Sequence, residues 1–530
     1  MTAPNGNFYV LLRARGLRAG EAPCLTVGAW ESLSYRALHA MAAQMADVLA
    51  SAGLRPGDRV VAQVEKSVAN VALYLGALFA GGVYVPLNTG YTAEETAYFL
   101  GDAAPAVFVC DPGRLAELSP HARQAGVGTV FTLDREGGGE LIDAARRAPC
   151  DTVVAQRGED DLAAILYTSG TTGRSKGAML THGNLASNAV ALNRLWGFSS
   201  DDVLLHALPV FHIHGLFVAL HVAMLSGCEI LFHKSFDTGA VRESLARATV
   251  MMGVPTFYAR LLARDDFRRE DAAHMRLFIS GSAPLTQETF NAFEARTGHR
   301  ILERYGMSEA GMIASNPLDE EQQGTQDGAS NGARRAGTVG FPLPGVSVRI
   351  APPDEGSAAS AQAPTDAAPG ATPPPGEVEI KGPNVFKGYW RNPEKTAEAF
   401  TPDGYFRTGD IGMLDGDGRL CLVGRAKDLI IAGGYNIYPK EIEQVLDALP
   451  GVAESAVVGA PHPDLGEGAI AVLVAAGDPP TDDEIAAALS RLARFKRPRR
   501  LYYVDALPRN AMGKVQKHLL RATYREAFSA

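Results

Sequence analysis

The chain contains few cysteines and no long apolar run. Its 530 residues include five cysteines, which are scattered without a CxxC pair, so neither a disulfide framework nor a structural zinc site is indicated. No apolar stretch approaches the roughly 18 residues that a membrane-spanning helix needs. The first residues lack a compact apolar segment followed by a small-residue cleavage site. We therefore expect a protein of the reducing cytoplasm without a membrane span.

Long basic runs are missing as well. The formal net charge is -9, which argues against nucleic acid as a partner. Hydrophobic residues at 46% and charged residues at 21% are ordinary for a globular enzyme. The length allows one large domain with a smaller companion. An anionic substrate would have to be met by local positive sites.

The order of apolar segments predicts layered α/β structure. From about residue 20 to 410, short apolar strands alternate with helical stretches. The segments 320–335 and 354–375 break this pattern and look like surface insertions, because they are polar or rich in Ala, Pro, Ser and Gly. After residue 410 we expect a compact α+β unit, with strands at 420–423, 454–459, 469–475 and 501–504 and helices at 439–449 and 482–493.

One loop between apolar segments is rich in glycine, hydroxyl and basic residues. Its candidate phosphate-binding residues are Thr168, Ser169, Gly170, Thr171, Thr172, Gly173 and Lys176. Glycines allow a close approach of the backbone to an anion, and hydroxyl and ammonium groups donate hydrogen bonds to it. A Walker-type loop would end in Gly-Lys-Ser/Thr and continue into a helix. Here Gly177 follows the lysine and a second strand comes next, so we predict a hairpin tip that holds polyphosphate.

Four further motifs follow in a fixed order: Tyr305-Gly-Met-Ser-Glu309, Tyr405-Phe-Arg-Thr-Gly-Asp410, Gly424-Arg-Ala-Lys-Asp428 and Asn510-Ala-Met-Gly-Lys514. With the loop, they make almost the whole chain resemble the adenylate-forming acyl-CoA synthetases. Three segments, at 212–216, 302–307 and 433–440, look most like those of malonyl-CoA synthetases.

The resemblance implies a fold and a reaction. The fold is α/β, with a large N-terminal adenylate-forming domain (1–410), a hinge segment (411–428) and a small mobile α+β C-terminal domain (429–530). In the implied reaction a carboxylate attacks the α-phosphate of ATP, and the thiol of CoA then displaces AMP from the acyl-adenylate. Mg²⁺ is the implied cofactor, and ATP, CoA and a dicarboxylic acid are the implied partners. A monomer and a homodimer both remain open.

The resemblance also assigns roles to individual residues. Glu309 is the candidate Mg²⁺ ligand, because Mg²⁺ takes one or two carboxylates beside phosphates, and Ser308 could donate to the α-phosphate. Lys514 would bridge the substrate carboxylate and the α-phosphate, and Lys427 lies at the hinge position. The adenine and ribose contacts are assigned to Gly281, Ser282, Ala283, Tyr305, Asp410 and Arg425. The CoA contacts are assigned to Gly433, Gly434, Arg494 and Lys496.

The acyl pocket is the least determined part of the site. A second carboxylate on the acid would need a cation or several donors. Arg304 is the first choice for that cation, with His214, Arg276 and Arg242 as alternatives, and Met307 is a further pocket candidate. His212 and His214 lack a third ligand at a suitable spacing for a metal, so we interpret them as pocket walls.

Other functions remain to be weighed. A ligase for another short, medium-chain or aryl acid would share these motifs, as would one that loads a carrier protein. A plain ATPase or kinase would release ADP instead of AMP and pyrophosphate. A nucleotide-binding sensor would show no carboxylate-dependent pyrophosphate release.

Overall fold

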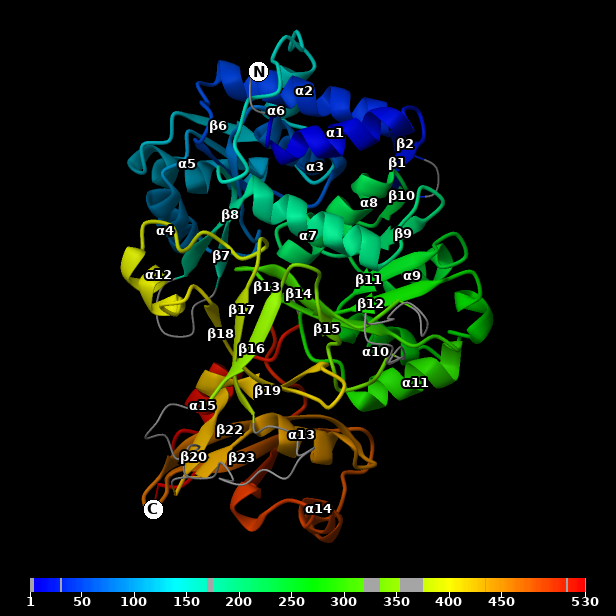
Figure 1. Ribbon diagram of the computed structural model, residues 1–530, viewed down its shortest axis with the longest axis vertical. Coiled ribbons are helices and arrows are strands. Elements are labelled where there is room, and N and C mark those ends of the chain that lie inside the picture. Colours follow the sequence, from blue (N-terminus) through cyan, green and yellow to red (C-terminus); the bar gives the residue numbers. More distant parts are fainter. Residues whose placement is uncertain are drawn as a thin grey trace.

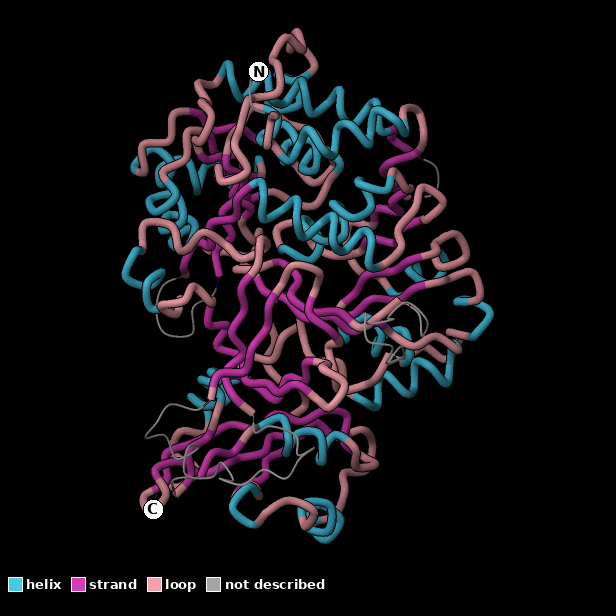
Figure 2. The backbone as a smooth tube through the Cα atoms, viewed as in Figure 1, coloured by secondary structure: helices cyan, strands magenta, loops and turns pink. Residues whose placement is uncertain are grey.

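The described residues form four sheets and the helices packed on them (Figures 1 and 2). The computed structural model describes residues 4–28, 31–168, 175–318, 334–352, 375–433, 435–510 and 513–529. The two expected insertions lie almost wholly outside these ranges. The helices are α1 (Phe8–Ala19), α2 (Tyr35–Ser51), α3 (Val68–Phe79), α4 (Ala93–Ala103), α5 (Leu115–Gln124), α6 (Glu140–Ala145), α7 (His182–Leu195), α8 (His221–Ser226), α9 (Thr238–Ser244), α10 (Pro255–Leu262), α11 (Gln287–Thr297), α12 (Pro393–Ala399), α13 (Pro439–Asp447), α14 (Asp482–Leu489) and α15 (Lys517–Thr523).

Two large sheets form the framework of the N-terminal part. The nine-stranded sheet has the order β15 (Phe341–Pro342), β14 (Gly311–Ser315), β13 (Leu302–Met307), β12 (Leu277–Ser280), β11 (Val250–Gly253), β9 (Val203–His206), β10 (Glu229–Phe232), β1 (Pro23–Val27) and β2 (Glu31–Ser34). The six-stranded sheet has the order β6 (Thr129–Thr132), β5 (Val107–Cys110), β3 (Arg59–Gln63), β4 (Val83–Pro86), β7 (Leu162–Thr168) and β8 (Lys176–Thr181). Both are parallel in the middle and antiparallel at an edge. The predicted α/β layering is confirmed.

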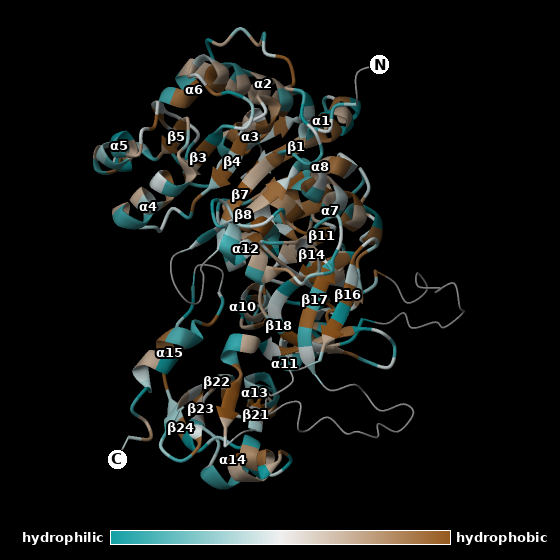
Figure 3. Ribbon diagram, turned by 60° about the vertical axis from the view of Figure 1, so that its left-hand side comes forward, coloured by the Kyte–Doolittle hydropathy of each residue, from teal (hydrophilic) through white to brown (hydrophobic). Residues whose placement is uncertain are grey.

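Helix α3 shows how the sequence creates this interior. Ser67 caps the helix by accepting a hydrogen bond from the backbone N–H of Asn70, and every helical residue except Val68 is buried. A helix that is apolar all round belongs inside the protein. Gly76 lets α2 approach, because a Cβ there would lie 2.5 Å from the Cβ of Met45. In Figure 3 the strands around α3 are correspondingly brown, the colour of hydrophobic residues.

A smaller antiparallel sheet connects the framework to the C-terminal part. Its order is β16 (Ser347–Ala351), β17 (Gly376–Lys381), β18 (Phe406–Leu414) and β19 (Leu420–Arg425). We expected the strand at 420–423 in the C-terminal unit, and this was wrong. The Asp415–Gly418 turn folds the chain back, so that β19 pairs with β18 and Asp410 faces Arg425 in the register.

The C-terminal unit has its own sheet and its own apolar clusters. Its strands are β20 (Ile430–Ala432), β21 (Tyr435–Ile437), β22 (Val452–His462), β23 (Gly466–Ala475) and β24 (Arg500–Tyr503). Ile442 and Leu446 form the buried stripe of α13. Helix α14 ends at Leu489, four residues before the expected end at 493. In Figure 1 this unit lies at the lower end of the molecule, and the short turn Ala426–Asp428 leads into it from β19. Within the described ranges, no helix is both long and apolar enough to cross a membrane.

Candidate active site

The two strands of the predicted hairpin are present as β7 and β8, while its tip lies outside the described residues. The two strands are antiparallel, and Thr168 faces Lys176 in the last register pair before the tip. The hydroxyl of Thr168 donates to the carbonyl of Lys176 over 3.4 Å. The predicted phosphate ligands Ser169, Gly170, Thr171, Thr172 and Gly173 lie outside the described residues.

Helix α4 holds both ends of this tip. Tyr167 donates its hydroxyl hydrogen to Asp102 over 2.5 Å, and Tyr98 donates to the carbonyl of Ser175 over 2.7 Å. The indole of Trp390 donates to the carbonyl of Asp102 over 3.0 Å. The chain on both sides of the candidate phosphate loop is therefore anchored to a single helix.

Glu309 lies beside the base of the hairpin. It is 7% exposed, and the hydroxyl of Tyr389 donates to its carboxylate over 3.1 Å. The ammonium group of Lys176 lies 4.4 Å from the centre of the Tyr389 ring. Burial raises the pKa of Glu309, while Tyr389, Arg425 and Lys176 act in the opposite direction. Ser308 is partly buried next to Glu309.

A lone carboxylate suits one kind of metal site. The described residues contain no group of three or more His, Cys, Asp or Glu side chains that could hold a metal ion. Mg²⁺ bound between a nucleotide and a protein needs only one or two carboxylates, with water and phosphate oxygens as the other ligands. The surroundings of Glu309 fit that mode of binding.

A second group joins Tyr305, Asp410 and Arg425. The hydroxyl of Tyr305 donates to Asp410 over 2.5 Å, and the Nε of Arg425 lies 3.0 Å from the other oxygen of the same carboxylate. Burial works to lower the pKa of Arg425, but Asp410, followed by Tyr305 and Glu309, raises it above its usual value. Arg425 is therefore a fixed cation in contact with the carboxylate.

Arg304 is a buried cation whose guanidinium is incompletely hydrogen-bonded. It is 2% exposed, and its Nε and Nη2 atoms have no hydrogen-bond partner among the residues that the structure describes. Burial lowers its pKa to about 9, while Tyr258 and Glu303 raise it. The guanidinium packs on Gly281, where an added Cβ would lie 2.5 Å from Cζ. The backbone of the loop after β12 thus forms one wall beside Arg304, and Ala283 is partly buried in the same loop.

His214 and Ser282 lie beside Arg304. The Oγ of Ser282 is 3.2 Å from the Nδ1 of His214, and Ser282 adopts a φ of 72°. The Nε2 of His214 is buried and has no hydrogen-bond partner in the described ranges. Burial lowers the pKa of His214, and Arg304 lowers it further. Met307 ends β13 and is partly buried.

The two other candidate arginines are engaged elsewhere. Arg276 forms hydrogen bonds to both oxygens of Asp202 at 2.6 and 2.7 Å. Arg242 pairs with Asp271 at 3.0 Å and Asp266 at 3.2 Å. Their charges are already neutralised by protein carboxylates, so neither suits the distal carboxylate.

Lys514 reaches the same site from the C-terminal unit. Its turn is closed by the side chain of Asn510, which accepts from the backbone N–H of Lys514 over 3.0 Å. A Cβ on Gly513 would lie 3.0 Å from the hydroxyl of Thr256, so this turn packs on α10. Burial lowers the pKa of Lys514 to about 8, and Arg425 lowers it too, whereas Asp410 raises it.

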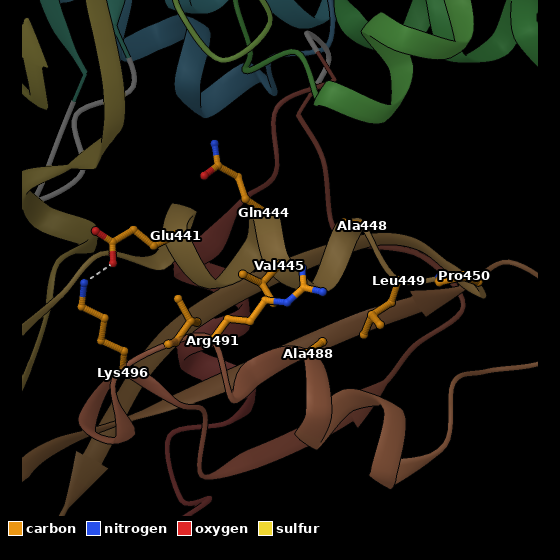
Figure 4. Close-up of a pocket in the computed structure, with 10 residues that line it drawn as sticks. Glu441, Gln444, Val445, Ala448, Leu449, Pro450, Ala488, Arg491 and Lys496 are labelled. Atoms are coloured by element: carbon orange, nitrogen blue, oxygen red, sulfur yellow. Dashed lines mark hydrogen bonds and ion pairs between the residues drawn. The ribbon is translucent and has the colours of Figure 1, made fainter. Parts of the chain in front are cut away.

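The candidate CoA residues belong to the C-terminal unit. Lys496 pairs with Glu441 at 2.5 Å beside a cavity of about 600 Å³ between α13 and α14 (Figure 4). Arg494 is exposed, and Gly433 is an exposed turn residue with a φ of 59°. Gly434 lies outside the described residues. Lys427 lies in the turn Ala426–Asp428.

Family models match both parts of the chain. Residues 12–390 match the AMP-binding enzyme family, and residues 441–514 match the AMP-binding enzyme C-terminal domain. The chain belongs to the AMP-binding enzyme family. The predicted resemblance is therefore confirmed.

Among the AMP-binding enzymes of known structure, the ATP-bound form of MatB from Rhodopseudomonas palustris is 48% identical. The match covers 99% of this chain and 100% of that one with a TM-score of 0.90, whereas the apo form gives 0.82. A malonate–CoA ligase of Arabidopsis thaliana is 35% identical over 515 residues, covering 88% of this chain and 78% of the relative. A feruloyl-CoA synthase of Amycolatopsis sp is 37% identical over 506 residues, covering 93% and 94%.

Some residues of this AMP-binding enzyme site were missed in the sequence. Tyr389 contacts Glu309 and lies under Lys176, and Asp102 holds Tyr167. The sequence offered a signal for Tyr389, because two adjacent aromatic residues, Tyr389 and Trp390, follow a glycine. It offered no signal for Asp102, because an acidic residue near the end of a helix is usually solvated.

Proposed function

We propose that this AMP-binding enzyme joins malonate, and to a lesser extent methylmalonate, to CoA, with ATP converted to AMP and pyrophosphate. The observation that carries the choice of acid is Arg304, a buried guanidinium of which two nitrogen atoms are unpaired within the described part of the chain. A buried cation of this kind is well matched by a carboxylate, which forms short charge-assisted hydrogen bonds with arginine. The malonate–CoA ligases among the relatives support the same assignment.

The distal carboxylate is proposed to bind Arg304, with Ser282 and His214 beside it. The anion would occupy a site that offers unpaired donors. A carboxylate buried without such a partner would cost about 3 to 5 kcal/mol. The pocket should therefore discriminate strongly between malonate and a monocarboxylate of equal length.

Adenylate formation is proposed to use the cations around Asp410. Lys514 would neutralise charge between the reacting carboxylate and the α-phosphate, where preorganised cations lower the barrier most. Thr168 and Lys176 would hold the pyrophosphate end. When bound, Mg²⁺ would neutralise phosphate charge and orient the triphosphate. Glu309 would hold it, and Ser308 would donate to phosphate.

Nucleotide binding is proposed to use the group around Asp410. This carboxylate can accept two hydrogen bonds from the ribose diol once its contact with Tyr305 yields. Arg425 would remain its counter-charge, and the loop containing Gly281, Ser282 and Ala283 would face adenine. Tyr305 would then be free to pack on the base.

The second step is proposed to need a different orientation of the C-terminal unit. The higher TM-score against ATP-bound than apo MatB supports the present arrangement as the adenylating one. Lys427 is the proposed pivot, within domain limits of 1–410, 411–428 and 429–530. After rotation, Gly433 and Gly434 would face the thiol path, and Arg494 and Lys496 would meet CoA phosphates. We also retain the cytoplasm as the proposed location.

An aryl acid is the second candidate substrate, because the feruloyl-CoA synthase relative is 37% identical. A panel of malonate, methylmalonate, acetate, butyrate and ferulate separates the two. Pyrophosphate and thioester formation are measured for each acid at saturating ATP and CoA. We expect malonate to give the highest kcat/KM, and a preference for ferulate or butyrate would refute the proposal. Release of ADP instead of AMP would refute the adenylating mechanism itself.

A further inference from the structure

Lys66 is a buried lysine outside the groups described so far. It follows β3 and is 6% exposed. Its Nζ lies 2.8 Å from the Nδ1 of His206, 2.9 Å from the carbonyl oxygen of His206 and 4.3 Å from the centre of the Phe232 ring. Among the described residues, no carboxylate contacts this amine. Burial lowers the pKa of Lys66, and its amine still has N–H groups to donate to both of these atoms of His206.

The contacts of His206 determine which of its nitrogen atoms carries the hydrogen. Its Nε2 lies 2.9 Å from the carbonyl oxygen of Gly215, and a carbonyl can only accept. The hydrogen must therefore be on Nε2. Burial, and Lys66 after it, lower the pKa of His206, so the ring is neutral and Nδ1 accepts from Lys66. Lys66 thereby holds His206 in the tautomer that donates to Gly215.

Gly215 belongs to the start of the π-helix His214–Leu220. A Cβ at this glycine would lie 2.1 Å from the carbonyl oxygen of Pro209. The backbone at Gly215 thus packs closely on Pro209 and also binds the ring of His206. Short π-helical segments occur frequently at functional sites. In Figure 1 this segment leads into α8, next to β9 and β10.

The residue immediately before Gly215 is His214, whose ring meets Ser282 and lies near Arg304. A shift of the Gly215 peptide would move the His214 backbone with it. Errors of about 1 Å in a binding group are enough to cost large factors in rate. The contacts from Lys66 through His206 and Gly215 thus lead to this pocket wall.

We infer that Lys66 is a positioning residue for the acyl pocket, acting through His206 and the Gly215 carbonyl on the side chain of His214. The inference rests on the proposed function only in taking this pocket as the acid site. It assigns no role in nucleotide binding to Lys66. Its effect should fall on the acid and leave ATP binding unchanged.

The first test compares Lys66→Met with Lys66→Gln. Met is similar to Lys in length, and its introduction leaves no carboxylate unpaired, because the described contacts of Lys66 are to His206 and Phe232; Met cannot donate to His206. We expect Lys66→Met to raise the KM for the acid about tenfold, with the KM for ATP within about twofold of wild type. Lys66→Gln keeps an N–H donor and should recover most of the loss. Lys395→Met, on the exposed face of α12, is the control and should match wild type.

Three results would overturn the inference. They are an unchanged KM for the acid in Lys66→Met, an equal rise in both KM values, and an effect of Lys66→Gln as large as that of Lys66→Met. The acid used is whichever the wild type prefers. A wild type that prefers a monocarboxylate would refute the proposed substrate, while the Lys66 variants still test the positioning role.

A second pair of variants tests the same chain of contacts if Lys66→Met does not fold. The amide of His206→Gln can place a donor near the former Nε2, whereas that of His206→Asn is too short to reach Gly215. We expect the KM for the acid to rise several-fold more in the Asn variant than in the Gln variant. Equal values in the two variants would contradict the role of the Gly215 contact.

Discussion

The pKa of Lys514 predicts how adenylate formation depends on pH. Burial and the cations Arg425 and Lys427 lower it to about 8, against the opposing effect of Asp410 and Asp428. Only the protonated ammonium can neutralise charge at the α-phosphate. In the free enzyme, kcat/KM should therefore fall about tenfold per pH unit above pH 8, because the protonated fraction falls by that factor.

The assay is the initial rate of pyrophosphate release from malonate and ATP, measured between about pH 6 and 10. The fall of kcat at high pH (the alkaline limb of the pH profile) should lie at higher pH than that of kcat/KM. The reason is that bound triphosphate adds negative charge next to the ammonium, which raises its pKa. Thioester formation from preformed acyl-adenylate should lack this limb. Lys514→Ala should abolish the first step and largely spare the second.

A second cation has to be separated from Lys514 in this assay, because burial lowers the pKa of Arg304 to about 9. Lys514→Arg separates the two groups, since a guanidinium in contact with solvent or phosphate stays charged throughout. If Lys514 is the titrating group, the limb near pH 8 disappears in this variant even where the overall rate is lower. A limb that stays at the same pH would refute the reasoning and assign the titration elsewhere.

Three further substitutions test the other parts of the site. Arg304→Met should lower kcat/KM for malonate by about 100-fold or more and leave kcat/KM for butyrate nearly unchanged, because only malonate has a second carboxylate to leave unpaired. Equal losses in pyrophosphate release for both acids would contradict this. Asp410→Asn should raise the KM for ATP about tenfold or more with little change in the KM for the acid, because the carboxylate shared by Tyr305 and Arg425 loses its charge. An unchanged KM for ATP would exclude the assignment of Asp410 to the ribose. Gly281→Ala should raise the KM for the acid several-fold, because the new methyl group collides with the Arg304 guanidinium; wild-type kinetics would show that the guanidinium is not held against this loop.

Local elements were predictable where a short stretch of sequence contains the whole cause. The helix after Ser67 is capped by that residue and continues through an apolar run, and Thr181 caps α7 after the second strand of the hairpin. The hairpin itself follows from two apolar segments around a glycine-rich tip. In such cases, the stabilising contacts join near neighbours in the chain.

The remaining features depend on contacts between distant residues. Tyr305 and Asp410 are 105 positions apart, and only the arrangement of the sheets brings them together. The strand at 420–423 was assigned to the wrong unit because pairing partners leave no trace in composition. The π-helix at 214–220 was not predicted either, since its hydrogen-bond pattern has no distinctive periodicity in the sequence.

The hairpin of β18 and β19 constrains attempts to re-engineer this enzyme. Asp410 and Arg425 are register partners near its open end, and the next residue, Ala426, already begins the turn that leads into the C-terminal unit. The proposed ribose contacts and the proposed pivot thus share one covalent segment. Substitutions that change nucleotide preference there should also alter the ratio of the two half-reaction rates. The loop after β12 is coupled in a different way, because Gly281 packs on Arg304 and changes there should alter acid binding.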